Sequence, residues 1–324
     1  MQSSFFLPQR TKVAVKTEIS HQDFVYILSY YDLGAFIQAS PITAGTVQTN
    51  YFLHTTQGKF VLRYYENRTK ESVLFETDLL TYLKTHRYPC PTPLKNQQGN
   101  CVGIFHCKPY VLFEFMTGRH ISHPNERQKQ QLIQKVAELQ SLTQQYQPRY
   151  MAHRWHYDVD LCRTLAQTKA KRINTKSAYK KLAWLENELA ALDLPESHPK
   201  GICHCDFHFS NVLFQNDQFA ALLDFDDANY TFLQFDLVGL IDSWAWPHTN
   251  DTLNMAEARR IVQTYMTCRP LSQMEQHHLF DVYKLSILFD CVWFFARGDA
   301  DDFYEKRKIA FLKNVKGDLL NAKM

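Results

Sequence analysis

The sequence lacks any long apolar run. No stretch approaches the roughly 18 consecutive apolar residues that a membrane-spanning helix needs. The first residues, MQSSFFLPQRTKVAVK, also lack the apolar segment that is typical of a secretory signal peptide. We therefore expect a soluble, cytoplasmic protein that has no membrane partner.

An excess of charge of one sign is absent as well. The 324 residues include 36 Lys and Arg and 33 Asp and Glu, for a formal net charge of +3. This balance predicts no strong field for a polyanion, and no recognised nucleic-acid-binding motif is present. We expect no nucleic-acid partner, and the sequence carries no signal for an oligomeric state.

A disulfide framework is also missing, because the eight cysteines are scattered along a long chain. Small secreted domains instead place many cysteines in a short sequence. The cysteines are therefore predicted to be reduced thiols. The length predicts about two domains, and the 45% of hydrophobic residues suffices for a sizeable core.

Strand patterns dominate the first third of the chain. Residues 49–65 predict a hairpin that turns at Thr56-Gln57-Gly58, and a second hairpin follows a turn at 96–100. Helical spacing of apolar residues predicts a helix over 69–86, and another over 22–38 that ends near Gly34.

Beyond residue 124 the pattern changes to long helical segments with one short hairpin over 211–225. Thr117-Gly118 is predicted to be a hinge between the two regions. The predicted fold is α+β and two-lobed: a small antiparallel β lobe with one helix over residues 1–116, and a larger, mainly helical lobe carrying a β-hairpin over 117–324.

The stretch HCDFHFSNVLF, residues 204–214, concentrates polar groups in front of a strand. Asp206 precedes the strand, Asn211 opens it, and Asp224 ends the returning strand 18 positions after Asp206. Because a hairpin brings its two ends together, Asn211 and Asp224 are predicted to converge. Two oxygen ligands suit Mg²⁺, and a separate carboxylate can accept a proton from an attacking hydroxyl.

These residues resemble the signature of the aminoglycoside phosphotransferase and choline kinase-like group, which has a protein-kinase-like fold. That group shows His-x-Asp-x-x-x-x-Asn and then a strand ending in an Asp-containing triplet, matched here by HCDFHFSN and LLDFDDA. The resemblance implies that Asp206 is catalytic and that Asn211 and Asp224 bind Mg²⁺. It also implies that three further residues support the structure of the catalytic loop: His204, His208 and Asp236.

The same resemblance implies a nucleotide site in the first lobe. Arg63 stands where many relatives have the phosphate-binding lysine, and Glu76 would orient it. The turn TAGTVQTN, with Gly45 and Asn50, would cover the phosphates, and Glu114 to Met116 would meet the adenine through main-chain groups.

Diffuse likenesses over roughly residues 17–315, such as YPCPTPL and WAW, point within this group to the kinase-fold homoserine kinases. The resemblance implies an ATP-dependent enzyme that phosphorylates the hydroxyl of a small metabolite, most simply L-homoserine to O-phospho-L-homoserine. Two alternatives stay open. One is a kinase for an aminoglycoside, choline, ethanolamine or a sugar; the other is a non-catalytic kinase-fold binding module.

Plainer interpretations accompany several of these residues. Cys203, Cys205 and the two nearby histidines have zinc-ligand spacings, but no second cluster completes a four-ligand site. Arg63 and Glu76 could form an ordinary surface ion pair of little energetic weight. Asp226 and Asp227 could be extra metal ligands, but they are expected to be solvent-facing turn residues.

Overall fold

The computed structural model describes residues 17–43, 47–246, 252–298 and 306–314. The chain divides into two compact units, neither of which is continuous in sequence. Unit 1 comprises Met1–Gly118, Pro148–Arg154 and Ala220–Asp226, and unit 2 comprises Arg119–Gln147, Trp155–Phe219 and Asp227–Met324. The predicted α+β class is confirmed, whereas the predicted lobe boundary at residues 116 and 117 stays a prediction.

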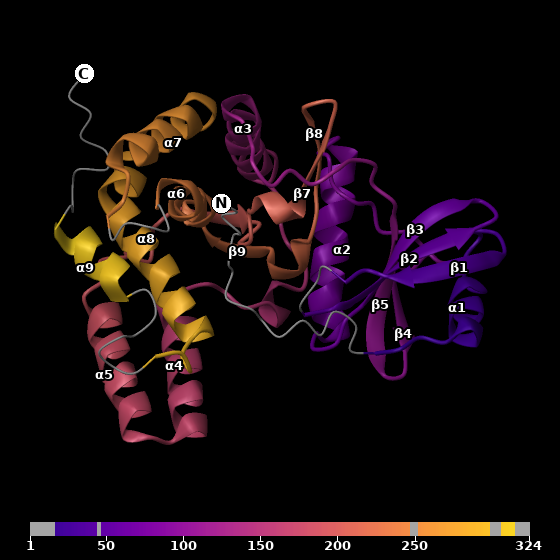
Figure 1. Cartoon of the computed structure of the whole chain (residues 1–324), viewed down its shortest axis with the longest axis horizontal. Helices are drawn as coiled ribbons and strands as arrows, with labels where there is room; N and C mark the ends of the chain where they lie inside the picture. Colours follow the sequence, from indigo (N-terminus) through magenta and orange to yellow (C-terminus); the bar gives the residue numbers. More distant parts are fainter. Residues whose placement is uncertain (1–16, 44–46, 247–251, 299–305, 315–324) are drawn as a thin grey trace, which may run out of the picture. The chain divides into compact units, whose positions relative to one another are not determined.

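Unit 1 is built on a five-stranded sheet in which every neighbouring pair is antiparallel. The strand order is β1-β2-β3-β5-β4 (Figure 1). Both predicted hairpins are present, and they supply the four strands β2 to β5. The strands are β1 (Phe36–Pro41), β2 (Thr49–Thr55), β3 (Gly58–Tyr64), β4 (Val102–Phe105) and β5 (Lys108–Glu114).

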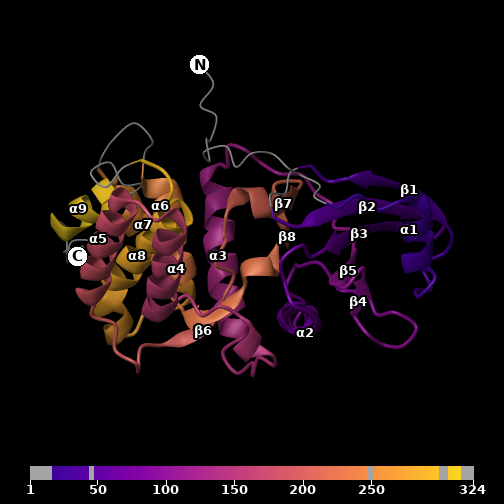
Figure 2. The same ribbon diagram turned by 90° about the horizontal axis from the view of Figure 1, so that it is seen from below.

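Helix α1 (His21–Leu28) lies against the β1 side of the sheet in both views (Figures 1 and 2). Its apolar residues share a core with inward-facing residues of β2 and β3, including Leu53 and Leu62. Burial of this apolar surface is the main force that holds α1 on the sheet. The prediction of a helix over 22–38 is wrong in its second half. The chain turns at Gly34, whose φ of +79° favours glycine, and then pairs as β1.

Helix α2 (Lys70–Thr85) packs on β4, β5 and the short 3₁₀ segment η1 (Met151–His153). The Thr69 side chain caps its N-terminus by accepting a hydrogen bond from the backbone N–H of Ser72. The helix buries Glu76 among apolar residues. Its position therefore brings one carboxylate into the interior of unit 1.

Unit 2 is mainly helical, as the sequence predicts. Helix α8 packs against α4, α5, α6 and α9, while α3 packs against α6, α7 and β6. Two short two-stranded sheets, β6-β9 and β7-β8, complete the fold. The helices are α3 (Glu126–Leu142), α4 (Val159–Ile173), α5 (Lys176–Ala190), α6 (Phe235–Ala245), α7 (Met255–Cys268), α8 (Gln273–Trp293) and α9 (Lys306–Asn314). The strands are β6 (Lys200–Cys203), β7 (Val212–Gln215), β8 (Gln218–Leu222) and β9 (Asn229–Phe232). The last three residues of β8, from Ala220 on, are assigned to unit 1.

Strands β7 and β8 are joined by Asn216 and Asp217, which both adopt the left-handed conformation, with φ of 50° and 58°. Two consecutive residues in that region suit a tight hairpin turn, and Asn and Asp tolerate it well. Within the described ranges, no helix is long and apolar enough to cross a membrane.

Candidate active site

Arg63 is the centre of a polar cluster in unit 1. Its position on β3 pairs it with Asn50 of β2, and Arg63 Nε donates to Asn50 Oδ1 at 3.1 Å. Arg63 Nη1 donates to Asp224 Oδ1 at 2.9 Å and to Glu76 Oε1 at 3.4 Å. The structure thus brings together four residues that the sequence assigned to nucleotide and metal binding. The shortest of these contacts joins Arg63 to Asp224.

Burial and the neighbouring charges shift the pKa values of Arg63 and Glu76 in opposite directions. Burial works to lower the pKa of Arg63, but the nearby carboxylates, Asp224 first, raise it above its ordinary value. Burial raises the pKa of Glu76 to about 7, although Arg63 pulls it down. Glu76 also accepts a hydrogen bond from the Tyr65 hydroxyl at 2.9 Å. Glu76 is 1% exposed, so its pair with Arg63 is an interior contact and not the plain surface ion pair.

Asp224 follows β8 in a left-handed conformation, with φ of 62°. Most residues with a Cβ are disfavoured there, and aspartate is among those that tolerate it best. Its side chain is 42% exposed, and Oδ2 makes no hydrogen bond with any residue that the structure describes. One carboxylate oxygen therefore faces Arg63, and the second is available to another partner.

Asp226 could be an extra metal ligand on the sequence alone but was expected to face solvent, and that expectation is wrong. The residue is 6% exposed. Its carboxylate accepts hydrogen bonds from Arg68 Nε at 2.9 Å and from Gln48 Nε2 at 2.8 Å. Arg154 Nη2 donates to its backbone carbonyl at 2.6 Å. Arg68 and these hydrogen bonds lower the pKa of Asp226 against the opposing effect of burial, so the charge of its carboxylate is stabilised.

These contacts anchor the Asp224 turn within unit 1. The partners of Asp226 come from the turn before β2, the segment before α2 and the residue that follows η1. Since Asp224 is two residues away, this anchoring restricts where its carboxylate can lie. No local pattern indicated this burial, because Asp226 lies in a 3₁₀ segment after β8 and its partners Gln48 and Arg68 are distant in the sequence.

In unit 2, Asp206 and Asn211 lie together. The Asn211 amide donates through Nδ2 to Asp206 Oδ2 at 2.8 Å and to the Asp206 backbone carbonyl at 2.9 Å. The Asp206 side chain is exposed. Its second oxygen, Oδ1, makes no hydrogen bond with the described part of the chain. The amide nitrogen of Asn211 is thus occupied, and its oxygen remains available as a hard ligand.

Asp236 holds the loop that carries Asp206. It lies in the first turn of α6, is 2% exposed, and accepts hydrogen bonds from the backbone N–H groups of His204 and Cys205 at 2.9 and 2.8 Å. Cys205 has a φ of 63°, a conformation that needs such support. Burial raises the pKa of Asp236, while His204 and the two N–H groups oppose the rise.

His204 and His208 stabilise the same loop locally. His204 Nδ1 accepts from the backbone N–H of Asp206 at 3.3 Å, and His208 Nδ1 accepts from that of Ser210 at 3.2 Å. The alternative zinc site is not formed among the described residues. Cys203 Sγ is buried against the Phe232 carbonyl, and no group of metal-ligand geometry includes residues 203–208.

Glu114, Met116 and Gly45 are the other residues predicted for the nucleotide site. The Glu114 side chain pairs with Lys84 at 3.1 Å on the surface. Met116 is half-buried, and Gly45 lies outside the described residues. Asn211 belongs to unit 2 and Asp224 to unit 1, so the metal site they were expected to share stays a prediction.

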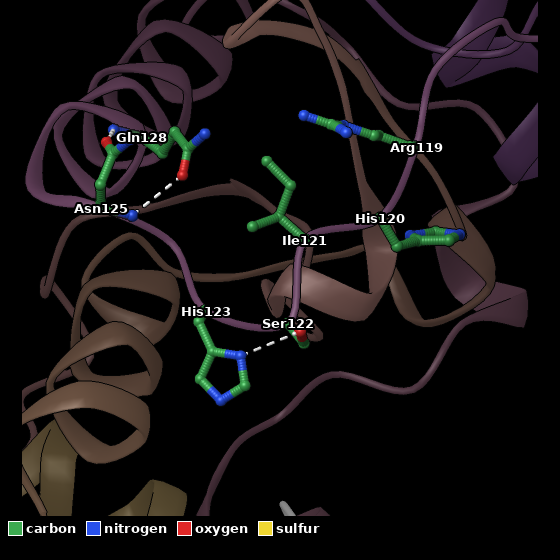
Figure 3. A pocket seen from close by; sticks show the side chains of 7 residues that line it. All are labelled: Arg119, His120, Ile121, Ser122, His123, Asn125 and Gln128. Carbon is green, nitrogen blue, oxygen red and sulfur yellow. Dashed lines mark hydrogen bonds between the residues drawn. The ribbon is translucent and has the colours of Figure 1, made fainter.

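A pocket of about 360 Å³ lies in unit 2 just after Gly118. Figure 3 shows its lining, which consists of residues 119–123 with Asn125 and Gln128 from the start of α3. The backbone of Arg119 pairs with Phe214 of β7, and His120 Nδ1 contacts the Val212 carbonyl at 3.0 Å. The pocket is therefore attached to the strand that follows Asn211, although none of the predicted site residues lines it.

The sequence of this chain matches a protein family and several individual proteins. Residues 38–271 match the family described as "Phosphotransferase enzyme family". A homoserine kinase of Parvibaculum lavamentivorans is 30% identical over 82% of this chain and 83% of its own length. A homoserine kinase of Rhodospirillum rubrum is 31% identical, with 81% of both chains covered.

Solved structures show the same fold. An amicoumacin kinase in complex with AMP-PNP, Ca²⁺ and Ami superposes with a TM-score of 0.64 at 16% identity, and 93% of both chains is covered. A spectinomycin phosphotransferase in complex with ADP and spectinomycin gives a TM-score of 0.58 at 13% identity, with 92% of this chain and 94% of that chain covered.

The fold and the matches define the class as a kinase-like phosphotransferase. The chain belongs to the phosphotransferase enzyme family. The predicted two-lobed kinase-like fold and the predicted kinase enzyme that acts on a small molecule are both confirmed. The alternative of a non-catalytic binding module is therefore set aside.

Proposed function

We propose that the chain transfers the γ-phosphoryl group of ATP to the hydroxyl of L-homoserine, giving O-phospho-L-homoserine. The observation that carries this proposal is the similarity to homoserine kinases, at 30% and 31% identity over four fifths of both chains. The match is spread along the chain and includes the helical unit. Similarity confined to the catalytic loop would support phosphoryl transfer without favouring this substrate.

Asp206 is proposed to position the substrate hydroxyl and to accept its proton. Its exposed side chain keeps Oδ1 available while Asn211 fixes Oδ2. A carboxylate held by one oxygen and open at the other can orient a hydroxyl for attack. Its orientation depends on the loop that Asp236, His204 and His208 support.

Mg²⁺ is the proposed metal cofactor, with Asn211 and Asp224 as its protein ligands. Both residues offer an oxygen that no described residue occupies, and hard oxygen donors are the ligands that Mg²⁺ selects. When bound, Mg²⁺ would neutralise charge on the nucleotide phosphates.

Arg63 is proposed to bind the phosphates in place of the lysine of many relatives. Its Nε and Nη1 are held by Asn50, Glu76 and Asp224. Nη2 makes no hydrogen bond within the part of the chain that the structure describes. The planar guanidinium can therefore stay anchored by one edge while the other edge donates to a phosphate oxygen.

The remaining roles are proposed on the resemblance alone. Gly45 and Asn50 would lie in the turn that covers the phosphates, and main-chain groups from Glu114 to Met116 would meet the adenine. The lobe boundary at residues 116 and 117 belongs to the same proposal.

A cytoplasmic location is also proposed. It agrees with the eight cysteines, which all lie in the described part of the chain and form no disulfide.

ADP release with Mg-ATP, measured against homoserine, choline, ethanolamine, several sugars and aminoglycosides, tests the proposal. Asp206→Asn serves as the blank. Homoserine-dependent turnover that is lost in the blank supports the assignment of both substrate and catalytic residue. Turnover on another compound alone would overturn the substrate and keep the reaction class. Homoserine turnover that survives in Asp206→Asn would overturn the role of Asp206.

A further inference from the structure

Three potential metal ligands lie together in unit 2, outside the residues of the active site. Asp193 belongs to the segment between α5 and β6, and His277 and His278 lie in the second turn of α8. One ligand atom from each residue lies within 4.8 Å of the other two. No other group of this kind occurs among the described residues.

His278 is the buried member of the cluster, with an exposure of 8%. Its Nδ1 lies 3.9 Å from Asp193 Oδ2 and has no hydrogen-bond partner within the described structure. That distance is too long for a hydrogen bond. A buried polar atom without a partner is unfavourable and calls for an explanation. The imidazole nitrogen faces a carboxylate, and a cation between them would satisfy both groups.

A second buried histidine, His198, lies beside His278. The rings of His198 and His278 lie 5.6 Å apart. Gln234 donates through Nε2 to the Glu275 carbonyl, so its oxygen accepts from His198 Nε2. The hydrogen bond with Gln234 occupies Nε2 of His198, so that nitrogen is not available to the cluster.

We propose that Asp193, His277 and His278 bind a divalent transition-metal ion of the Zn²⁺ type, with water in the remaining position. Two imidazoles and one carboxylate favour such an ion over Mg²⁺, which prefers oxygen ligands. Tetrahedral zinc bonds place neighbouring ligand atoms about 3.3 Å apart. The pair of Asp193 and His278, now at 3.9 Å, would close by about 0.6 Å on that geometry. Asp193 and His277 are exposed, so both side chains can adjust.

The bound ion would join two segments that are distant in sequence. The segment that carries Asp193 already contacts α8, because Ser197 Oγ lies 4.0 Å from Met274 Sδ. It continues into β6, whose last residue, Cys203, precedes the catalytic-loop residue His204. An ion that binds only the folded chain stabilises it. The site would therefore stabilise the connection that leads into the catalytic loop.

The test uses untagged full-length protein that has been freed of metal with a chelator. Zn²⁺ is titrated by calorimetry in excess Mg²⁺, and thermal unfolding is followed with and without Zn²⁺. The variants are Asp193→Asn and His277→Gln, which change exposed side chains and should leave the fold intact. His86→Gln is the matched control, since His86 is an exposed histidine in unit 1.

The proposal predicts one Zn²⁺ per chain and a rise in the unfolding temperature for wild type and for His86→Gln. Each ligand variant should bind about tenfold more weakly or worse and lose the rise. The proposal is overturned if no stoichiometric binding occurs. It is equally overturned if binding survives either ligand substitution, as binding at the exposed thiols of Cys107 and Cys268 would.

Discussion

Each unit combines an accessible aspartate with a buried one, but the two units build the combination differently. In unit 1, Asp224 and Asp226 are two residues apart, and the buried Asp226 is held by the side chains of Arg68 and Gln48. In unit 2, Asp206 and Asp236 are 30 residues apart. The hydrogen bonds that the structure shows to the buried Asp236 carboxylate come from the backbone N–H groups of His204 and Cys205.

The difference separates two ways of positioning a reactive carboxylate. A buried charge with charged partners is stabilising only while its partners remain, so unit 1 depends on a network of side chains. A buried carboxylate that accepts backbone N–H groups fixes the path of a loop directly. We therefore expect substitutions of the accessible aspartates to change activity, and substitutions of the buried ones to change stability and positioning.

The largest effect is expected from Asp206→Asn. The amide keeps the shape of the side chain but cannot accept a proton, and loss of a general base lowers turnover by about 10² to 10⁴-fold. Nucleotide affinity and unfolding temperature should stay near wild type, because Asp206 is exposed. Steady-state kinetics, nucleotide binding and thermal unfolding measure the three quantities. Asp160→Asn, another exposed carboxylate, is the control, and equal losses in both variants would contradict a specific role.

A comparison of Asp226→Ala with Asp224→Ala tests the distinction within unit 1. Removing Asp226 takes the carboxylate from Arg68, whose side chain is 14% exposed, and breaking a buried pair costs about 3–5 kcal/mol. Asp224 is 42% exposed, so its loss should cost less stability and should weaken Mg-nucleotide binding instead. Urea denaturation and nucleotide titration separate the two outcomes. Equal stability losses would show that the turn is anchored at both aspartates.

Asp236→Asn is expected to have an intermediate effect. The amide retains one acceptor oxygen, so one of the two backbone N–H groups of the loop loses its partner. An unsatisfied buried donor costs about 1–3 kcal/mol. If Asp236 positions Asp206, turnover should fall while nucleotide affinity is retained, and the pH profile of turnover should keep its shape. A loss of stability with unchanged turnover would limit Asp236 to a structural role.

The helices and strands that depend on local sequence patterns were predictable from the sequence. The hairpins of β2 to β5 follow from β-branched residues around tight turns, and the long helices follow from apolar spacing. Strand β1 was missed because Phe36–Pro41 has little alternation of its own, and its strand geometry depends on pairing with β2. Strands β6 and β9 are four residues each and pair only with each other, so they also lacked a local signal.

The candidate site shows the same limit. The spacing of Asp206, Asn211 and Asp224 was visible in the sequence, and it carried the chemistry. The burial of Asp226 was not, because its partners Gln48 and Arg68 lie more than 150 positions away. The Arg63–Asp224 contact likewise joins residues 161 positions apart. Local spacing thus predicts which residue types can react, while long-range contacts decide which of them are buried.

The smallest expected effect concerns Glu76 and pH. Burial raises its pKa from the ordinary value of 4.5 to about 7. Between these values the folded chain binds a proton that the unfolded chain has released, so this group's contribution to the unfolding free energy decreases as pH rises. The slope is at most about 1.4 kcal/mol per pH unit. Above the folded pKa the contribution is lost.

Glu76→Gln cannot titrate and should remove this dependence. Thermal unfolding of both proteins from about pH 5 to about pH 8 should show wild type losing stability relative to the variant across this range, with Glu126→Gln, an exposed control, following wild type. Parallel curves for wild type and Glu76→Gln would mean that Arg63 holds Glu76 ionised throughout. In that case the buried carboxylate of α2 would resemble Asp226, whose charge is stabilised by an arginine, and unit 1 would contain two permanently charged pairs around the Asp224 turn.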